Sequence, residues 1–295
     1  MNTENLFQSA TEVAQGLERV DYIPNSKITT AVFLADRLKK PVLIEGPAGT
    51  GKTELAKSVA KAVEARLIRL QCYEGLDESK ALYEWNYKKQ LLRIQAQNLV
   101  NDKDDETWKE LEQDIFSEEF LLTRPLLEAI VSEDRTVLLI DEVDRIEIET
   151  EALLLEILSD FQVSIPELGT LVAKRLPLVF LTSNNSRELS EALKRRCLFL
   201  HIDYPDMERE KSIIKRRVPE VEGALLNQIG EFVRSIRQMD LKKRPSVSES
   251  IDWAKTLITL GIHSLDLEVA TDTISVLLKY QSDIDTALKE LAVNL

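Results

Sequence analysis

The chain has 295 residues and carries 38 lysines and arginines against 51 aspartates and glutamates, a formal charge of −13. Because nucleic-acid-binding surfaces are usually basic, this balance argues against a dedicated DNA- or RNA-binding protein. The two cysteines lie far apart without metal-ligand spacing, which predicts reduced thiols and no zinc site. The N-terminus lacks a signal-peptide pattern, and no run of about 18 apolar residues occurs, so we expect a cytoplasmic protein without a membrane span.

Apolar runs of strand length alternate with helical patterns over the first two thirds of the chain. The runs expected to form strands lie at residues 41–45, 66–72, 136–142, 176–184 and 197–204. Residues 52–65, which follow the first run, place apolar side chains at helical spacing. Strands that alternate with helices predict an α/β fold with a parallel sheet that is covered on both faces.

Two parts of the chain depart from this alternation. Residues 76–130 contain more helical material than one crossover connection needs, and we expect a helical insertion whose acidic stretch either docks a partner or keeps the protein soluble. Towards the C-terminus only helical patterns remain, and Ser246 with Glu249 resembles a capping box at the start of one helix. We therefore expect an α/β domain at residues 1–204 and a small helical domain at residues 205–295.

The stretch IEGPAGTGKTELAK, residues 44–57, matches the phosphate-binding pattern G-x-x-x-x-G-K-[ST] through Gly46, Gly51, Lys52 and Thr53. It follows a predicted strand and opens a predicted helix, which is the context that this motif requires. Glycines let backbone N–H groups turn toward phosphate oxygens, and a helix N-terminus adds positive potential. We expect Lys52 to pair with β- and γ-phosphates and the Thr53 hydroxyl to hold Mg²⁺, a better explanation than a chance glycine turn.

Two later strands are predicted to end on polar residues at the edge of the sheet where ligands bind in open α/β folds. The run VLLIDE ends on Asp141 and Glu142, and the run LTSNN contains Asn184. Asp141 is expected to position Mg²⁺, directly or through water, and Glu142 to activate the attacking water as a general base. Asn184 is expected to orient that water or to contact the γ-phosphate, the alternative being that it caps the following helix.

Three basic triplets stand out in this acidic chain, at residues 194–196, 215–217 and 242–244. Each could simply form a solvated helix face. The first triplet directly precedes a predicted strand and therefore sits at a sheet edge. If that edge faces a neighbouring subunit, an arginine there could reach the neighbour's γ-phosphate, a contact worth about 10³–10⁵ in rate.

Taken in this order, the phosphate loop, the DE strand end, the Asn strand end and the segment LSEALKRRC resemble those of AAA+ ATPases. More narrowly, the chain resembles the MoxR family over roughly Asp21–Leu260. The subgroup that includes the carbon monoxide dehydrogenase maturation ATPase is similar in four stretches: PVLIEGPAGTGKTELAK, LQCYEGLDESKALYEWNYKKQLL, LLIDEVDR and KKRPSVSESIDWA. The second and fourth are the more specific ones. The resemblance implies a P-loop NTPase αβα core with a five-stranded parallel sheet in the order 5-1-4-3-2, a small all-α lid domain and a homo-oligomeric, commonly hexameric ring.

The resemblance also implies roles for individual residues. Asp141 and Glu142 correspond to Walker B, Asn184 to sensor 1 and Arg196 to the arginine finger, with Arg195 beside it as a rival. A β-hairpin is expected over about residues 161–178. The residues expected in Walker A and around the nucleotide are Gly46, Pro47, Ala48, Gly49, Thr50, Gly51, Lys52, Thr53, Glu54, Tyr22 and Ile23. The family's sensor 2 arginine falls on Ser248 here, and Arg244 or Lys243 are the candidates that substitute for it.

The resemblance implies ATP and Mg²⁺ as cofactors and an ATP hydrolase that acts as a chaperone. MoxR ATPases typically insert metal cofactors into enzymes or mature enzyme complexes, and often work with a von Willebrand factor A partner. We therefore expect a motor that remodels or matures a client metalloenzyme. One alternative is a nucleic-acid-associated AAA+ ATPase such as a helicase loader, against which the acidic charge argues. Another is an assembly scaffold in which nucleotide only sets ring formation, against which the intact Glu142 argues.

Overall fold

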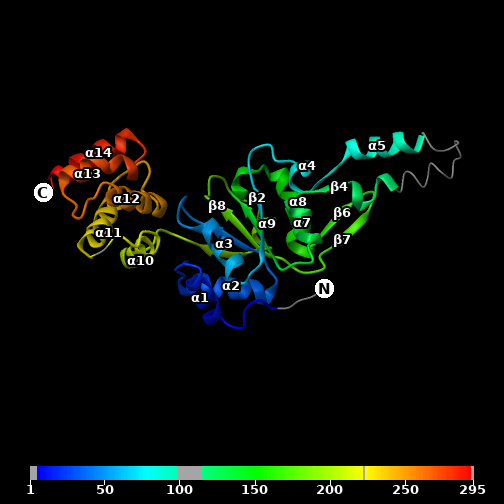
Figure 1. Ribbon diagram of the computed structural model, residues 1–295, viewed down its shortest axis with the longest axis horizontal. Coiled ribbons are helices and arrows are strands. Elements are labelled where there is room, and N and C mark those ends of the chain that lie inside the picture. The colour runs from blue at the N-terminus through cyan, green and yellow to red at the C-terminus, as the bar shows by residue number, and fades with distance from the viewer. Residues whose placement is uncertain (1–4, 99–113, 222, 294–295) are drawn as a thin grey trace.

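A five-stranded parallel sheet forms the centre of the larger part of the molecule (Figure 1). The computed structural model describes residues 5–98, 114–221 and 223–293. The strands lie side by side in the order β2-β5-β8-β1-β9. Counted along the chain and taken from the β9 edge, this is the order 5-1-4-3-2, so that prediction is confirmed. The strands are β1 (Val42–Glu45), β2 (Arg66–Gln71), β5 (Thr136–Asp141), β8 (Leu178–Ser183) and β9 (Leu198–His201).

Successive strand residues point to opposite faces of this sheet, so its apolar strands present apolar side chains on both faces. Helices cover both. On one face, Leu43 and Leu138 belong to an apolar cluster with α7 and α8. On the other face, Ile44 and Leu139 pack with α1, α2 and α3. The αβα core that the sequence predicted is therefore present. Its helices are α1 (Ala10–Arg19), α2 (Ser26–Leu38), α3 (Lys52–Ala62), α7 (Pro125–Val131), η2 (Val143–Arg145), α8 (Ile148–Asp160) and α9 (Glu191–Lys194).

Two small antiparallel sheets accompany the central sheet. The first, β3 (Tyr83–Trp85) with β4 (Leu121–Thr123), lies inside the insertion that was expected to be helical. Three-residue strands are too short to produce a recognisable period, and here buried Trp85 packs edge-on against Phe116. The second sheet pairs β6 (Gln162–Ile165) with β7 (Gly169–Val172), within the range where a hairpin was expected.

The rest of the insertion is helical where the structure describes it. Helix α4 (Glu78–Ala81) precedes β3, α5 (Tyr87–Asn98) follows it, and the short helix η1 (Glu118–Phe120) precedes β4. In Figure 1, α5 extends away from the central sheet. Most of the acidic stretch for which a docking or solubilising role was expected falls on residues 99–113, which lie outside the described residues.

Among the described residues after β9, five helices form a bundle with an apolar cluster of its own, at the end of the molecule opposite α5 (Figure 1). Trp253 is fully buried in this cluster, and its indole N–H donates to Thr273 Oγ1 at 2.8 Å. Ser246 and Glu249 form the predicted capping box. No described helix has the length and apolar character needed to cross a membrane. The bundle contains α10 (Met207–Arg217), α11 (Gly223–Gln238), α12 (Val247–Thr259), α13 (Leu267–Leu277) and α14 (Gln281–Val293).

Candidate functional site

The loop between β1 and α3 is enclosed by two other segments of the chain. A Cβ atom added to Gly46 would lie 1.9 Å from the carbonyl oxygen of Ile202, which follows β9. A Cβ atom added to Gly49 would lie 2.5 Å from the Cβ of Ser246, the N-cap of α12. Gly46 and Gly49 thus allow the loop to pack closely against the residue after β9 and against the helical bundle, besides the wrapping around phosphates that the sequence predicted.

Lys52 links this loop to the end of β8. Its ammonium donates to the carbonyl oxygens of Gly46 and Pro47 at 2.7 Å each and to Asn184 Oδ1 at 2.9 Å. Burial lowers the pKa of Lys52, although three nearby carboxylates oppose this shift. Asn184 therefore faces Lys52 and does not cap α9, whose N-cap is Ser190.

The two residues predicted to hold Mg²⁺ contact each other directly. Thr53 Oγ1 donates to Asp141 Oδ1 at 2.9 Å, and Thr182 Oγ1 donates to the same oxygen at 2.5 Å. Asp141 is buried, and its second oxygen, Oδ2, accepts a hydrogen bond from Arg69 Nε at 3.0 Å. The Thr53 hydroxyl at the N-terminus of α3 and the Asp141 carboxylate at the end of β5 are oxygen ligands of the kind that Mg²⁺ uses together with substrate phosphates. The residues present therefore fit this ion.

Glu142 lies beyond the strand end in a left-handed backbone conformation, with φ of 57°. Its N–H donates to Thr182 Oγ1 at 2.9 Å, which fixes the turn. Its carboxylate accepts a hydrogen bond from Gln71 Nε2 at 3.3 Å and lies 3.6 Å from Arg145 Nε. A non-glycine residue held at positive φ stores strain, which is commonly found at functional sites.

A buried carboxylate that sequence reasoning missed, Asp144, anchors the loop that carries Asn184. It accepts hydrogen bonds from the Asn184 N–H at 3.2 Å, the Ser186 N–H at 2.9 Å and the Ser186 hydroxyl at 2.6 Å. Burial by itself would raise the pKa of Asp144, but these hydrogen bonds outweigh burial and lower it. Asp144 lies three residues after Asp141 in the segment LLIDEVDR. This short distance in sequence from the acidic pair could have identified it as a residue of the site.

A cavity of about 340 Å³ opens beside the phosphate loop, between the core and helices α10 and α12. Tyr22 and Ile23, the residues predicted to pack the adenine, line it together with Glu54 and Gly49. Burial raises the pKa of Tyr22 to about 12. Apolar side chains from both parts of the molecule, including Ile23 and Ile251, form walls suited to a purine base.

The bundle is tied to the core around this cavity by arginines of α10. Arg209 donates to the carbonyl oxygen of Ile23 at 2.9 Å. Arg216 pairs with Asp21 at 2.8 Å and Arg217 pairs with Glu54 at 2.6 Å. Of the two ion-pairing arginines, Arg217 lines the cavity and Arg216 does not. The second basic triplet therefore joins the two parts of the molecule and is not merely a solvated helix face.

The three candidates for sensor 2 lie in different places. Ser248 lines the cavity, and its hydroxyl oxygen would lie 3.5 Å from a Cβ atom added to Gly49. Lys243 and Arg244 are not among the described residues that line the cavity. The Lys243 ammonium lies 3.7 Å from a carboxylate oxygen of Glu249, and Arg244 is exposed.

The two candidates for the arginine finger differ in their surroundings. Arg196 Nη1 donates to the carbonyl oxygen of Ala192 at 2.8 Å, and Arg196 Nε donates to Ser159 Oγ. The Arg195 side chain is 82% exposed and reaches Glu191 only at 4.0 Å. In the part of the chain that the structure describes, neither arginine hydrogen-bonds to the group formed by Lys52, Asp141 and their partners.

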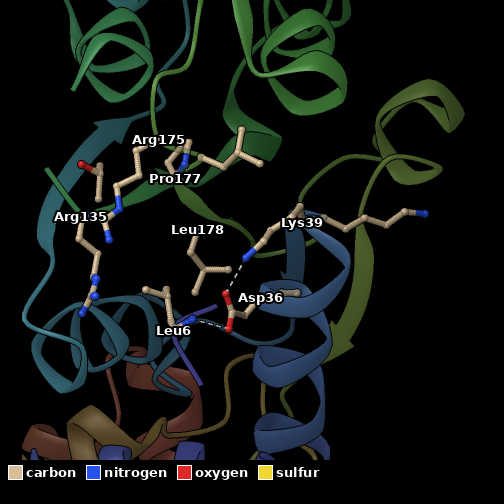
Figure 2. A pocket seen from close by; sticks show the side chains of 11 residues that line it. Leu6, Asp36, Lys39, Arg135, Arg175, Pro177 and Leu178 are labelled. Atoms are coloured by element: carbon tan, nitrogen blue, oxygen red, sulfur yellow. Dashed lines mark hydrogen bonds and ion pairs between the residues drawn. The ribbon is translucent and has the colours of Figure 1, made fainter. Parts of the chain in front are cut away.

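A second cavity lies at the opposite, amino edge of the sheet (Figure 2). There the Asp36 carboxylate accepts hydrogen bonds from the Lys39 ammonium at 3.0 Å and from the Leu6 N–H at 2.7 Å. The volume of this cavity, about 20 Å³, leaves room for no more than one or two water molecules. The cavity of about 340 Å³ is the candidate site because Gly49 and Gly51 of the phosphate loop line it.

Comparison with known proteins supports this choice of site. Residues 41–197 match the family described as AAA domain (dynein-related subfamily). The chain belongs to this family. AAA+ ATPases of this kind generally bind ATP with Mg²⁺, hydrolyse it and assemble into oligomers. The matched range contains the phosphate loop and the ends of β5 and β8.

Relatives of similar length are found in staphylococci. An uncharacterized protein of Staphylococcus haemolyticus (strain JCSC1435) is 26% identical over 231 residues, in a match that covers 76% of this chain and 78% of that protein. An uncharacterized protein of Staphylococcus aureus (strain bovine RF122 / ET3-1) is 27% identical over 76% of this chain and 77% of that protein. Among solved structures, the match with a mutant of Thermotoga maritima RuvB covers 92% of this chain and 73% of that chain, with 20% identity and a TM-score of 0.52. That likeness shows the AAA+ fold alone.

Proposed function

We propose that this AAA+ protein is a MoxR-type ATPase that couples ATP hydrolysis to the remodelling or metal-cofactor maturation of a client enzyme complex. The observation that carries the ATPase proposal is the meeting of Lys52 with Asn184 and of Thr53 with Asp141 at one sheet edge, with Glu142 beside them. The narrower assignment is supported by the stretch LQCYEGLDESKALYEWNYKKQLL and by KKRPSVSESIDWA, which resemble the subgroup of the carbon monoxide dehydrogenase maturation ATPase.

Each residue of the group has a distinct part in the proposed mechanism. The Lys52 ammonium, now held by two loop carbonyls, binds the β- and γ-phosphates. Thr53 and Asp141 would hold Mg²⁺, which would neutralise developing phosphate charge. Glu142 accepts a proton from the water that attacks the γ-phosphorus, and Asn184 orients that water. The bond between the γ-phosphorus and the bridging oxygen breaks, which yields ADP and inorganic phosphate.

The proposed active form is a homo-oligomeric ring, with six subunits as the family suggests, in which an arginine reaches the neighbour's γ-phosphate. The resemblance places this arginine at Arg196, whereas the exposure of the Arg195 side chain favours Arg195. Comparison of Arg195→Ala with Arg196→Ala in assembled protein distinguishes the two. The finger variant loses turnover but keeps nucleotide binding and assembly.

The proposed lid is formed by residues 205–295, and the proposed core by residues 1–204. Hydrolysis is proposed to tilt the lid against the core, because the cavity proposed for the nucleotide is lined by Tyr22 on one side and by α12 on the other. We propose a von Willebrand factor A protein as partner and a metalloenzyme as client. The charge of −13 argues against the nucleic-acid alternative. Salt-dependent binding to duplex or single-stranded DNA, with stimulation of turnover, would replace the proposed client class with nucleic acid.

The decisive experiment replaces Glu142 by glutamine. We expect turnover to fall by about 10²–10⁴-fold, the usual contribution of a general base, while calorimetry still detects binding of ATP with magnesium. Glu149→Gln, an exposed acid on α8 with the same change of charge, is the matched control and should keep full turnover. Unchanged turnover in Glu142→Gln would refute the assigned base. Absence of any affinity of the folded wild-type protein for adenine nucleotides would refute the proposal as a whole.

A further inference from the structure

Arg69, on edge strand β2, contacts the aspartate proposed to bind Mg²⁺. β2 pairs with β5 in a register that places Gln71 opposite Asp141 and Arg69 opposite Leu139. Arg69 and Gln71 are two residues apart, so their side chains leave the same face of the strand. Arg69 therefore reaches along the sheet, past its own partner in the register, to Asp141.

The contacts of Asp141 leave neither carboxylate oxygen without a hydrogen-bond donor. Oδ1 accepts hydrogen bonds from Thr53 and Thr182. Oδ2 accepts two hydrogen bonds from one guanidinium, from Arg69 Nε at 3.0 Å and from Arg69 Nη2 at 2.5 Å. The two ends of this ion pair differ in freedom, since the Asp141 side chain is 3% exposed and the Arg69 side chain 45% exposed. Arg69 can swing into solvent, whereas Asp141 cannot.

We propose that Arg69 is a positioning residue that competes with Mg²⁺ for the Asp141 carboxylate and thereby sets the Mg²⁺ requirement of the site. This inference rests on the proposed function. Mg²⁺ is a small ion that demands near-ideal octahedral geometry of its oxygen ligands, so a guanidinium that binds Oδ2 stands in the way of coordination. A cation beside a dication is also repelled. Entry of the metal must therefore displace Arg69 or work against its charge.

The same guanidinium connects the metal position to the proposed general base. Arg69 Nη2 also donates to Gln71 Oε1, and Gln71 Nε2 donates to Glu142 Oε2 at 3.3 Å. A chain of hydrogen bonds thus runs from Asp141 through Arg69 and Gln71 to Glu142. Displacement of Arg69 removes the hydrogen bond that Gln71 Oε1 accepts. Binding of the metal at Asp141 therefore loosens the Gln71 side chain, which donates a hydrogen bond to Glu142.

The test compares Arg69→Gln, which removes the charge but keeps a polar side chain, with Arg69→Lys, which keeps the charge but loses the two-pronged contact. The control is Arg66→Gln, in the same strand, whose native side chain pairs with Glu128 at the other end of the strand. The affinity for ADP is measured by calorimetry at a series of free Mg²⁺ concentrations, and bound Mn²⁺ is followed by electron paramagnetic resonance. Neither readout requires turnover.

For Arg69→Gln we expect the half-saturating Mg²⁺ concentration to fall roughly tenfold, because one charge-assisted contact with a buried carboxylate is lost. Arg69→Lys should shift it less, and Arg66→Gln should leave it at the wild-type value. A half-saturating Mg²⁺ concentration that stays the same or rises in Arg69→Gln, in protein that still binds ADP, overturns the inference while the proposed function stands. If wild-type protein binds no nucleotide at any Mg²⁺ concentration, the proposed function fails instead.

Discussion

Replacement of Gly46 by alanine should destabilise the protein because this residue is packed against backbone. Gly46 has φ of +152°, which L residues rarely adopt, and an added Cβ atom would lie 1.9 Å from the carbonyl oxygen of Ile202. Real Cβ atoms essentially never approach another atom closer than 3.0 Å, so the ends of β1 and β9 must separate by about 1.1 Å, the difference between these distances. The hydrogen bond from Ile202 N–H to the Glu45 carbonyl oxygen, 2.8 Å long, would break.

The two costs can be added. Backbone strain of this kind costs about 1–3 kcal/mol. Loss of the hydrogen bond costs about 0.5–1.5 kcal/mol. The free energy of unfolding should therefore fall by roughly 3 kcal/mol, which lowers the melting temperature by roughly 5–10 °C. The change also reaches the connection to the helical bundle, since Ile202 directly precedes it.

The assay is urea and thermal unfolding followed by circular dichroism, without nucleotide, so that loss of phosphate binding does not enter. Gly51→Ala is the control from the same loop: Gly51 has φ of +91°, but an added Cβ atom would meet no other atom within 4 Å. It should cost only the left-handed backbone penalty, about 1–2 kcal/mol. If Gly46→Ala is no less stable than Gly51→Ala, the packing of Ile202 against the loop does not explain the glycine.

Three further outcomes are expected. Burial, reinforced by nearby carboxylates, raises the pKa of Cys72 to about 12, so its thiol stays protonated through neutral and mildly alkaline pH. Alkylation of Cys72 at pH 8, measured by peptide mass spectrometry, should therefore be roughly 10³-fold slower in folded than in urea-unfolded protein. Arg217→Ala should weaken ATP binding several-fold in calorimetry, whereas Arg216→Ala, which removes a comparable ion pair but an arginine that does not line the cavity, should not. Equal effects would contradict a role of Arg217 at the nucleotide. Glu210→Ala removes the carboxylate partner of Arg237, whose side chain is only 10% exposed, and should lower the free energy of unfolding in urea by about 3–5 kcal/mol. A decrease under about 1 kcal/mol would show that water reaches the Arg237 guanidinium.

The fold was predictable because its signals are local or periodic. The alternation of apolar runs and helical patterns indicated the parallel sheet, and the observed β1 and β5 lie within one residue of the expected ranges 41–45 and 136–142. The strands β3 and β4 gave no such signal, since each has three residues and they pair across a long stretch of sequence. Trp85 of β3 also packs on Phe116, which is distant in the chain.

Within the candidate site, the sequence by itself determined the groups that are contiguous in the chain, the phosphate loop and the acidic pair at Asp141. Only the tertiary structure decided which distant residues join them. Arg69 reaches Asp141 because β2 and β5 are neighbours in one register, and Arg217 borders the nucleotide cavity because α10 folds back onto the core. Strand pairing and helix docking depend on interactions between residues far apart in sequence, and a short motif carries no record of them.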